Sequence, residues 1–266
     1  MAASLREKGE RFRALHEGPA FFIPNPWDVG SAKVLAALGF PALATTSSGF
    51  AFTLGKPDGG TSLDEVVAHT AALAAGTDVP LAVDLENGHG DAPQDAARAI
   101  ARVARAGAVG GSIEDYDRRE RLYDLHQAVE RVAAAVAQAR ALDVPFVLTA
   151  RTENQLRGSR DLDETIIRLR AFERAGADVL FAPGLRTADE VRRVCEAVSR
   201  PVNVLVHAGL RRDEVVAAGA QRMSVGGALT WTAVEAMAAA ARAMLEDGDL
   251  SALRGGGQVA EWRAAG

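Results

Sequence analysis

The sequence has one cysteine, no long apolar run and no block of like charge. Cys195 stands alone among 266 residues, so the chain cannot form an internal disulfide. Its apolar stretches end before the ~20 residues that span a bilayer, and its first residues lack the apolar core of a signal peptide. We therefore expect a cytoplasmic protein with no membrane segment.

The charge pattern excludes one class of partner. The net charge of −5 comes from interspersed acidic residues and arginines, so the chain lacks the basic patch that nucleic-acid binding requires. An anionic substrate would need a local cation.

With 48% hydrophobic and 24% charged residues, the composition is that of a globular protein. The length suits one barrel domain over residues 1–266, with a peripheral glycine-containing tail from about residue 251.

Eight short apolar runs organise the chain as an internal repeat. They occupy residues 21–25, 38–47, 79–87, 106–115, 144–154, 175–183, 200–209 and 218–226. The stretches between them place apolar residues at helical spacing. Strands that are buried on both faces and joined by helices form parallel sheets. Eight such units favour a closed, TIM-type (β/α)8 barrel over an open doubly wound sheet.

Polar residues stand at the carboxyl ends of these predicted strands, where a barrel builds its active site. They are Ser47, Ser48, Asp84, Glu86, Glu114, Asp115, Arg151, Glu153 and His207. Carboxylates at one mouth repel and raise one another's pKa unless a cation lies between them. Oxygen ligands without a Cys/His cluster indicate a hard cation, so we predict Mg²⁺, with Mn²⁺ as a substitute.

The carboxylate spacing supports this metal site. Asp84 and Glu86 lie two residues apart, so on a regular strand they face the same way and bracket one ion. A helix cap or a solvated turn would explain the pair alone, but Glu114 at the next strand end favours the metal. Arg151 ends an apolar run, where a cation needs an anionic neighbour. A substrate carboxylate would supply this anionic neighbour, and so would a salt bridge to Glu114 or Glu153; both can hold at once.

Three further features have open interpretations. The segment TSSGF at 46–50 offers hydroxyl and backbone N–H groups that suit a carboxylate or an enolate oxygen. His207 is interpreted either as an acid/base group or as a cap on a neighbouring carbonyl. Cys195 lies in a helical pattern, where packing explains it better than nucleophilic chemistry.

The ordered motifs TSSGF, VDLENGHG, GSIED and ARTEN, together with Asp58, resemble the isocitrate lyase/phosphoenolpyruvate mutase superfamily. FAPGL and RMSVGGAL extend the resemblance across nearly the whole barrel. That family takes its metal-binding carboxylates from a D-x-D-x-G-x-G motif. Asp84, Gly88 and Gly90 match this motif, and Glu86 replaces its second Asp.

The resemblance implies roles for single residues. Asp58 lies in a gating loop near the substrate, and Ser48, Gly49 and Phe50 form the turn that binds the substrate carboxylate. The predicted metal ligands are Asp84, Glu86 and Glu114. The predicted catalytic residues are Asp58, Arg151 and Tyr123. The predicted substrate-binding residues are Ser47, Ser48, Gly49, Phe50, Asp84, Arg151, Asn154 and His207.

One loop departs from the family pattern. Lyases that act on isocitrate-like substrates carry K-[KR]-C-G-H after the position of Glu114, whereas residues 115–127 here read DYDRRERLYDLHQ. The cysteine that protonates the enolate is absent, and Tyr123 or Tyr116 is available in its place. The Lys-Thr-Asn pattern of phosphonate enzymes is absent too.

These features predict a Mg²⁺-dependent lyase that breaks a carbon–carbon bond next to an α-keto or α-hydroxy acid through an enolate, by decarboxylation or retro-aldol cleavage. Oxaloacetate decarboxylation needs little more than this shared core. A phosphonate mutase or hydrolase and a catalytically silent keto-acid-binding barrel are the alternatives. The resemblance also implies a homotetramer in which the last helix is swapped onto a neighbouring subunit.

Overall fold

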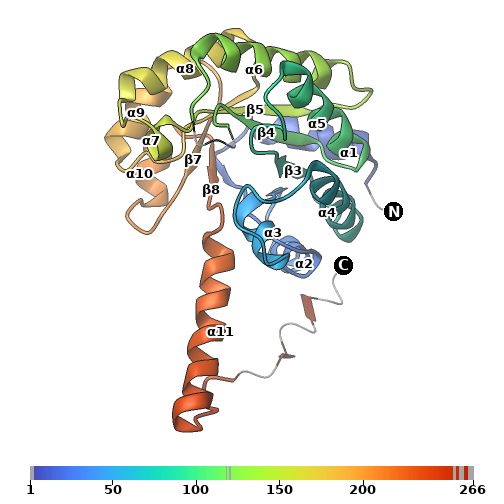
Figure 1. The fold of residues 1–266 in the computed structure, drawn as a ribbon, viewed down its shortest axis with the longest axis vertical. Helices are drawn as coiled ribbons and strands as arrows, with labels where there is room; N and C mark the ends of the chain where they lie inside the picture. The colour runs from blue at the N-terminus through green and yellow to red at the C-terminus, as the bar shows by residue number, and fades with distance from the viewer. Residues whose placement is uncertain (1–2, 118, 120, 254–255, 258–260, 263–266) are drawn as a thin grey trace.

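The computed structural model of the chain is an α/β barrel, and it describes residues 3–117, 119, 121–253, 256–257 and 261–262. Eight parallel strands pair in the order β1-β8-β7-β6-β5-β4-β3-β2. They are β1 (Phe21–Phe22), β2 (Leu43–Ala44), β3 (Leu81–Asp84), β4 (Gly110–Glu114), β5 (Val147–Arg151), β6 (Val179–Phe181), β7 (Val202–Leu205) and β8 (Arg222–Ser224). Each strand lies within one of the eight predicted runs, so the predicted (β/α)8 fold class is confirmed (Figure 1).

A side chain takes part in joining the first two strands. Pro24 and Pro26 lack the N–H groups that a regular ladder needs, and one backbone bond, from Ala44 N–H to Pro24 O at 3.1 Å, links the segments. The amide of Asn25 donates to the carbonyls of Ala44 and Thr45 at 3.0 and 3.1 Å. Asn25 Oδ1 also accepts two backbone N–H groups from the turn after β8. Asn25 therefore ties β1, β2 and the end of β8 together.

Helices between the strands cover the outside of the barrel (Figure 1). They are α2 (Val29–Ala37), α4 (Leu63–Gly76), α5 (Pro93–Arg105), α6 (Leu125–Arg140), α8 (Leu162–Arg174), α9 (Ala188–Ala197) and α10 (Arg212–Ala217). Helix α5 illustrates their packing: Ala96, Ile100 and Val103 recur every three or four residues and are buried. Two short helices, α3 (Ser47–Thr53) and α7 (Asn154–Arg157), follow β2 and β5 at the mouth.

Helix α1 (Leu5–Leu15) closes the opposite end of the barrel. Its Phe12 is fully buried among side chains from the starts of the strands. A Cβ at Gly110 would lie 2.5 Å from Phe12 Cε1, so only glycine fits there. The phenyl ring therefore fills the base of the barrel, and ligands have access from the mouth.

The last helix, α11 (Ala228–Asp247), projects away from the barrel (Figure 1). Thr230 is its one buried residue. Several large apolar side chains of the helix are exposed: Trp231, Met237, Met244 and Leu245. No helix in the described part of the chain is long and apolar enough to cross a membrane.

Candidate active site at the mouth of the barrel

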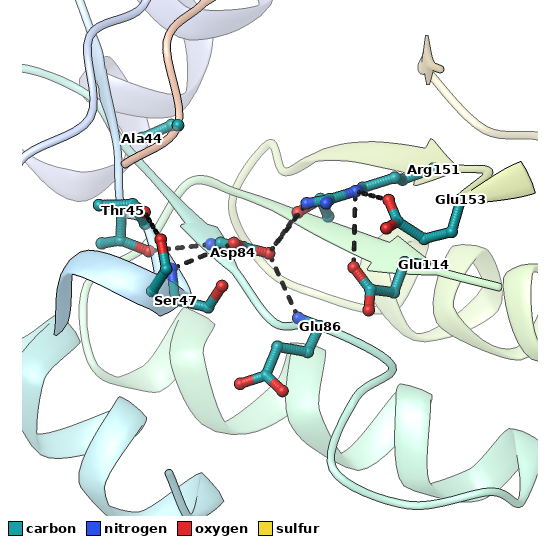
Figure 2. Close-up of polar contacts among 12 residues, drawn as sticks. Ala44, Thr45, Ser47, Asp84, Glu86, Glu114, Arg151 and Glu153 are labelled. Carbon is teal, nitrogen blue, oxygen red and sulfur yellow. Dashed lines mark hydrogen bonds and ion pairs between the residues drawn. The ribbon is translucent and has the colours of Figure 1, made fainter. Parts of the chain in front are cut away.

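Three charged side chains meet where neighbouring strands end (Figure 2). Asp84 ends β3, Glu114 ends β4 and Arg151 ends β5. Glu114 and Arg151 are direct register partners. Because the carboxyl ends of parallel strands share one edge of the barrel, residues far apart in sequence converge there.

Asp84 is held by neighbouring backbone and hydroxyl groups. Its own N–H donates to Thr45 Oγ1 at 2.9 Å, and the N–H of Ser47 donates to its Oδ2 at 3.2 Å. Its Oδ1 accepts from the N–H of Glu86 at 3.3 Å and from Ser112 Oγ at 3.4 Å. These contacts fix the carboxylate while leaving it partly accessible from the mouth.

The guanidinium of Arg151 lies among three carboxylates (Figure 2). Its Nε is 2.5 Å from Glu153 Oε1 and 3.5 Å from Glu114 Oε2. Its Nη1 is 3.8 Å from Asp84 Oδ1. Glu153 is completely buried, so its charge depends on this arginine and on one other. The predicted salt bridge to Glu114 or Glu153 is therefore present, and the predicted substrate contact of Arg151 stays a prediction.

The other arginine is Arg157, which the sequence analysis did not single out. Its Nε donates to Glu153 Oε2 at 3.1 Å, and its Nη2 is 3.8 Å from Asp58 Oδ2. Its guanidinium lies 4.8 Å from the centre of the Tyr116 ring. Arg157 thus connects the loop of Asp58 to the barrel wall and to the loop after β4.

Glu86 follows β3 in a loop with an unusual backbone. Its φ is 50° and that of His89 is 60°, in a region that side chains seldom adopt. Arg131, buried on α6, donates to the carbonyls of Asn87 and Ala92 and holds this loop in place. The Glu86 carboxylate accepts from Thr61 Oγ1 at 3.4 Å. It points away from Asp84 and Glu114 (Figure 2).

Burial and charge both act on the protonation of this cluster. Burial raises the pKa of Glu114 well above its ordinary value, Arg151 opposes the rise, and neighbouring carboxylates add to it. Burial lowers the pKa of Arg151, but the carboxylates led by Glu153 outweigh it, and the net pKa is raised. The mouth therefore holds more carboxylates than Arg151 and Arg157 together neutralise, which favours a further cation.

The chemistry of the donor set fits a hard divalent cation. Asp84, Glu86 and Glu114 offer carboxylate oxygens, which are the ligands that Mg²⁺ and Mn²⁺ prefer. Among the described residues, no group of three or more His, Cys, Asp or Glu side chains is arranged to hold a metal ion. Glu86 would have to turn from Thr61 toward Asp84 to share an ion with it. The three residues remain predicted ligands.

Two adjoining cavities lie at the mouth. One, of about 220 Å³, reaches into the barrel, and the other, of about 210 Å³, lies at the rim. The residues that line both are Ser47, Asp58, Arg151 and Arg157. The predicted site residues found in these linings are Ser47, Ser48, Asp58, Asp84, Glu86, Glu114 and Arg151. The structure therefore brings these seven residues to one place.

Two members of the TSSGF segment lie outside both linings. Gly49 packs beneath the start of α11, where a Cβ would lie 2.5 Å from Thr230 Oγ1. The ring of Phe50 stacks on His69 with ring centres 3.8 Å apart. Both residues support the turn that presents Ser47 and Ser48, because they pack it against its neighbours.

Asn154 and His207 also lie outside the linings. Asn154 is fully buried, and its amide donates to the carbonyls of Ser159 and Asp161. His207 is exposed, and its Nδ1 accepts from the N–H of Gly209 at 3.1 Å. These contacts organise the chain after β5 and after β7.

The structure distinguishes the two tyrosines. The Tyr123 hydroxyl donates to Asp91 Oδ1 at 2.7 Å and accepts from Asn87 Nδ2 at 3.0 Å. Burial, followed by the bond to Asp91, raises the pKa of Tyr123 to about 12. Tyr123 lines neither cavity, whereas Tyr116 lines the rim cavity together with Arg157. Tyr116 therefore has the better position to reach a bound substrate.

Cys195 lies on α9, outside both linings. Its side chain packs against the hydrophobic core, and a Cβ at Gly219 would lie 3.0 Å from its own Cβ. Burial raises the pKa of this thiol to about 12. A partly buried, protonated thiol is a poor nucleophile, in agreement with the packing interpretation.

Comparison with known proteins adds family relationships to this geometry. A family model described as phosphoenolpyruvate phosphomutase matches residues 12–245. This range includes every strand of the barrel and nearly all of α11.

Curated relatives and solved structures resemble the chain over most of its length. A 2-methylisocitrate lyase of Escherichia coli is 30% identical over 210 residues, which are 75% of this chain and 70% of the relative. An oxaloacetate decarboxylase of Bradyrhizobium diazoefficiens is 28% identical over 209 residues, which are 75% of this chain and 71% of the relative. A solved structure from Burkholderia cenocepacia J2315 is 50% identical and has a TM-score of 0.94, with 98% of this chain and 96% of that one covered.

Proposed function

The chain belongs to the phosphoenolpyruvate phosphomutase family, and from this premise we propose that it is a Mg²⁺-dependent carbon–carbon lyase that acts on an α-keto or α-hydroxy acid. It is an enzyme of the isocitrate lyase/phosphoenolpyruvate mutase superfamily. The observation that carries the proposal is the position of Arg151, which lies beside Asp84 and Glu114 and lines both cavities, of about 220 and 210 Å³. A small acid fits this space, and an arginine fork suits its carboxylate.

Asp84, Glu86 and Glu114 would hold the cation. When it is bound, a divalent cation supplies positive charge that stabilises negative charge on a substrate oxygen. Arg151 then binds the substrate carboxylate with the N–H groups that Glu153 does not occupy. The hydroxyls of Ser47 and Ser48 face the same cavity and orient the acid. Asp58, paired with Arg157, holds the gating loop against the rim.

The proton step favours decarboxylation over aldol-type cleavage. Loss of CO2 leaves the bonding electron pair on the substrate as an enolate, and one carbon must then take a proton. The cysteine of isocitrate-type lyases has no counterpart in residues 115–127. Tyr116, which lines the rim cavity, takes this role. Oxaloacetate, whose decarboxylase is a relative of the chain, is the first substrate to test.

The matching family model favours a second candidate, cleavage of a carbon–phosphorus bond in a phosphonate keto acid. The same carboxylates and Arg151 would bind the keto acid. Phosphonopyruvate distinguishes this candidate, because a lyase of carbon–carbon bonds leaves it intact.

The exposed apolar face of α11 supports a homotetramer with this helix swapped between subunits. Met237 is 62% exposed and Leu245 is 87% exposed. A helix that buries so little of its apolar surface within its own subunit gains stability by packing on another copy. We also propose a cytoplasmic location, in keeping with the single cysteine.

A metal-dependent substrate screen tests the proposed function. Purified protein is incubated with 2-keto and 2-hydroxy acids, first with Mg²⁺ and then with a chelator, and released pyruvate and CO2 are measured. Asp84→Asn, which removes one predicted ligand charge, should lower turnover at least ~100-fold. Asp78→Asn, at an exposed position before the same strand, is the control and should not. Chelator-resistant turnover, or none with any acid, overturns the proposal.

A further inference from the structure

Polar side chains line part of the barrel interior beneath the mouth, where barrels of this type usually place bulky branched apolar side chains. The larger cavity is lined there by Ser112, Thr149, Asn203, Arg222 and Ser224. These residues come from β4, β5, β7 and β8. The cavity therefore continues from the charged mouth into a well that these polar side chains partly line.

Arg222 is the one charged residue of this well. Its side chain is nearly inaccessible, at 6% exposure for the residue. Nε donates to Asn203 Oδ1 at 2.9 Å, Nη2 donates to Thr149 Oγ1 at 2.9 Å, and Nη1 lies 3.2 Å from His16 Nε2. Each terminal nitrogen keeps a second N–H group beyond these bonds.

None of these partners carries a compensating negative charge. Asn203 and Thr149 are neutral. Burial, and to a smaller extent the positive charge of Arg222, lower the pKa of His16 to about 3. The imidazole is therefore neutral at pH 7. Within the part of the chain that the structure describes, no carboxylate lies within 4.0 Å of the Arg222 nitrogens. Burial lowers the pKa of Arg222 to about 9, which still leaves it a cation. A buried, unneutralised cation is costly unless an anion joins it.

The well lies within reach of a substrate held at the mouth. Thr149, which binds Arg222, precedes Arg151 by two residues on β5. Residues two apart on a strand face the same side and are separated by roughly 7 Å. A small diacid that fills the cavity therefore contacts side chains at both levels. Arg151 and Arg222 line the same cavity.

We propose that Arg222, oriented by Asn203 and Thr149, binds the distal carboxylate of a dicarboxylate substrate whose keto or hydroxy acid end lies at the mouth. This inference rests on the proposed function for the position of the first carboxylate. It assigns Arg222 a role in specificity: the enzyme selects diacids over monoacids with the same reactive end.

Equilibrium binding tests the inference independently of turnover. With Mg²⁺ present, calorimetry compares 2-oxoglutarate with 2-oxobutanoate, which shares the keto acid end and lacks the distal carboxylate. Oxalate reports on the mouth alone. We expect the wild-type protein to bind the diacid at least about tenfold more tightly than the monoacid, as a charge-assisted hydrogen bond provides. Arg222→Met should abolish this preference and leave oxalate affinity unchanged.

Two further variants keep the test decisive if Arg222→Met does not fold. Arg222→Lys retains the charge but loses the fork, so the diacid preference should fall while oxalate binding persists. Arg168→Lys alters a buried arginine that pairs with Asp115 and lines neither cavity, so the preference should not change. A wild-type protein without diacid preference, or an equal loss for all three ligands in Arg222→Lys, overturns the inference. If no acid is turned over but the Arg222-dependent preference is present, the proposed function fails and the inference stands.

Discussion

At the scale of single residues, Arg151 has the structural role that the sequence allowed, and its contact with a substrate carboxylate is our proposal. It neutralises the buried Glu153 and keeps N–H groups directed at the cavity. Lysine has a single charged nitrogen and matches a planar carboxylate less well. The structural and substrate-binding roles therefore predict different consequences for the same substitution.

We predict that Arg151→Lys raises KM by roughly 10- to 100-fold, the loss expected when one bidentate charged contact is removed. Steady-state kinetics on the substrate found by the screen measures this. Arg140→Lys is the control, because Arg140 makes a comparable pair with Asp178 outside the site. An unaltered KM in Arg151→Lys would assign this arginine a purely structural role.

Substituting each of the two tyrosines near the mouth distinguishes a catalytic hydroxyl from a structural one. Tyr116→Phe should lower kcat by about 100-fold or more, as loss of a general acid does. Tyr123→Phe loses its bonds to Asp91 and Asn87 and should lower the free energy of unfolding by about 1–3 kcal/mol with little change in kcat. Turnover rates and denaturant unfolding of both variants are the measurements. The opposite pattern would return the catalytic role to Tyr123.

Whether a site residue could be predicted from the sequence depended on its position in the chain. Asp84, Glu114 and Arg151 end apolar runs, and the barrel geometry brings strand ends together. Arg222 and Asn203 lie inside such runs, where the direction of a polar side chain depends on the register of the strand. The loop after Glu114 has no regular periodicity, so no pattern in the sequence supported the prediction of Tyr123 over Tyr116 as the catalytic residue. Arg157 lies in a helix of four residues, too short to produce a pattern.

At the scale of elements, the strands and most outer helices were predictable because each has its own period and boundary signals. The helical patterns at 95–106, 124–142 and 161–175 correspond to α5, α6 and α8. Helix α1 was missed because it is largely polar and buries only Gly9 and Phe12. The side-chain link through Asn25 between β1 and β2 depends on two distant turns, and no local pattern indicates it.

The contact between α1 and β8 predicts a pH dependence of stability. His16 follows α1 and bonds to the Phe12 carbonyl and to Arg222. Burial lowers its pKa from 6.5 to about 3 in the folded chain. Below pH 6.5 the unfolded chain binds a proton that the folded chain does not, so the free energy of unfolding falls as the pH drops from about 6.5 toward 3.

Between pH 7 and pH 5 this residue should account for ~2 kcal/mol of lost stability. Denaturant unfolding at both pH values measures the loss in the wild type and in His16→Gln, which should lose correspondingly less. His126→Gln, at an exposed position on α6, should follow the wild type. Equal pH dependence in all three proteins would contradict a buried neutral imidazole at residue 16.

At the scale of the whole molecule, α11 determines assembly in our proposal. Met237→Glu with Leu245→Glu places two charges on its exposed apolar surface and should convert the tetramer to smaller species. Light scattering after size-exclusion chromatography measures the mass. Ile167→Glu, at a 54% exposed apolar position on α8, is the matched control and should leave the mass unchanged. A wild-type monomer would contradict the swapped assembly.

The whole site combines a carboxylate cluster suited to a divalent cation with a loop that lacks the isocitrate-type cysteine. The account therefore predicts which bond the enzyme breaks: one whose cleavage releases CO2 and needs only one later proton transfer. Oxaloacetate satisfies that requirement, whereas isocitrate and 2-methylisocitrate require the missing acid.

The most direct test is a side-by-side assay of oxaloacetate, 2-methylisocitrate and isocitrate, with Mg²⁺ present and then chelated. We predict that kcat/KM for oxaloacetate exceeds the other two by at least ~100-fold, and that chelation abolishes the activity. Efficient, chelator-sensitive release of glyoxylate from isocitrate would contradict the account.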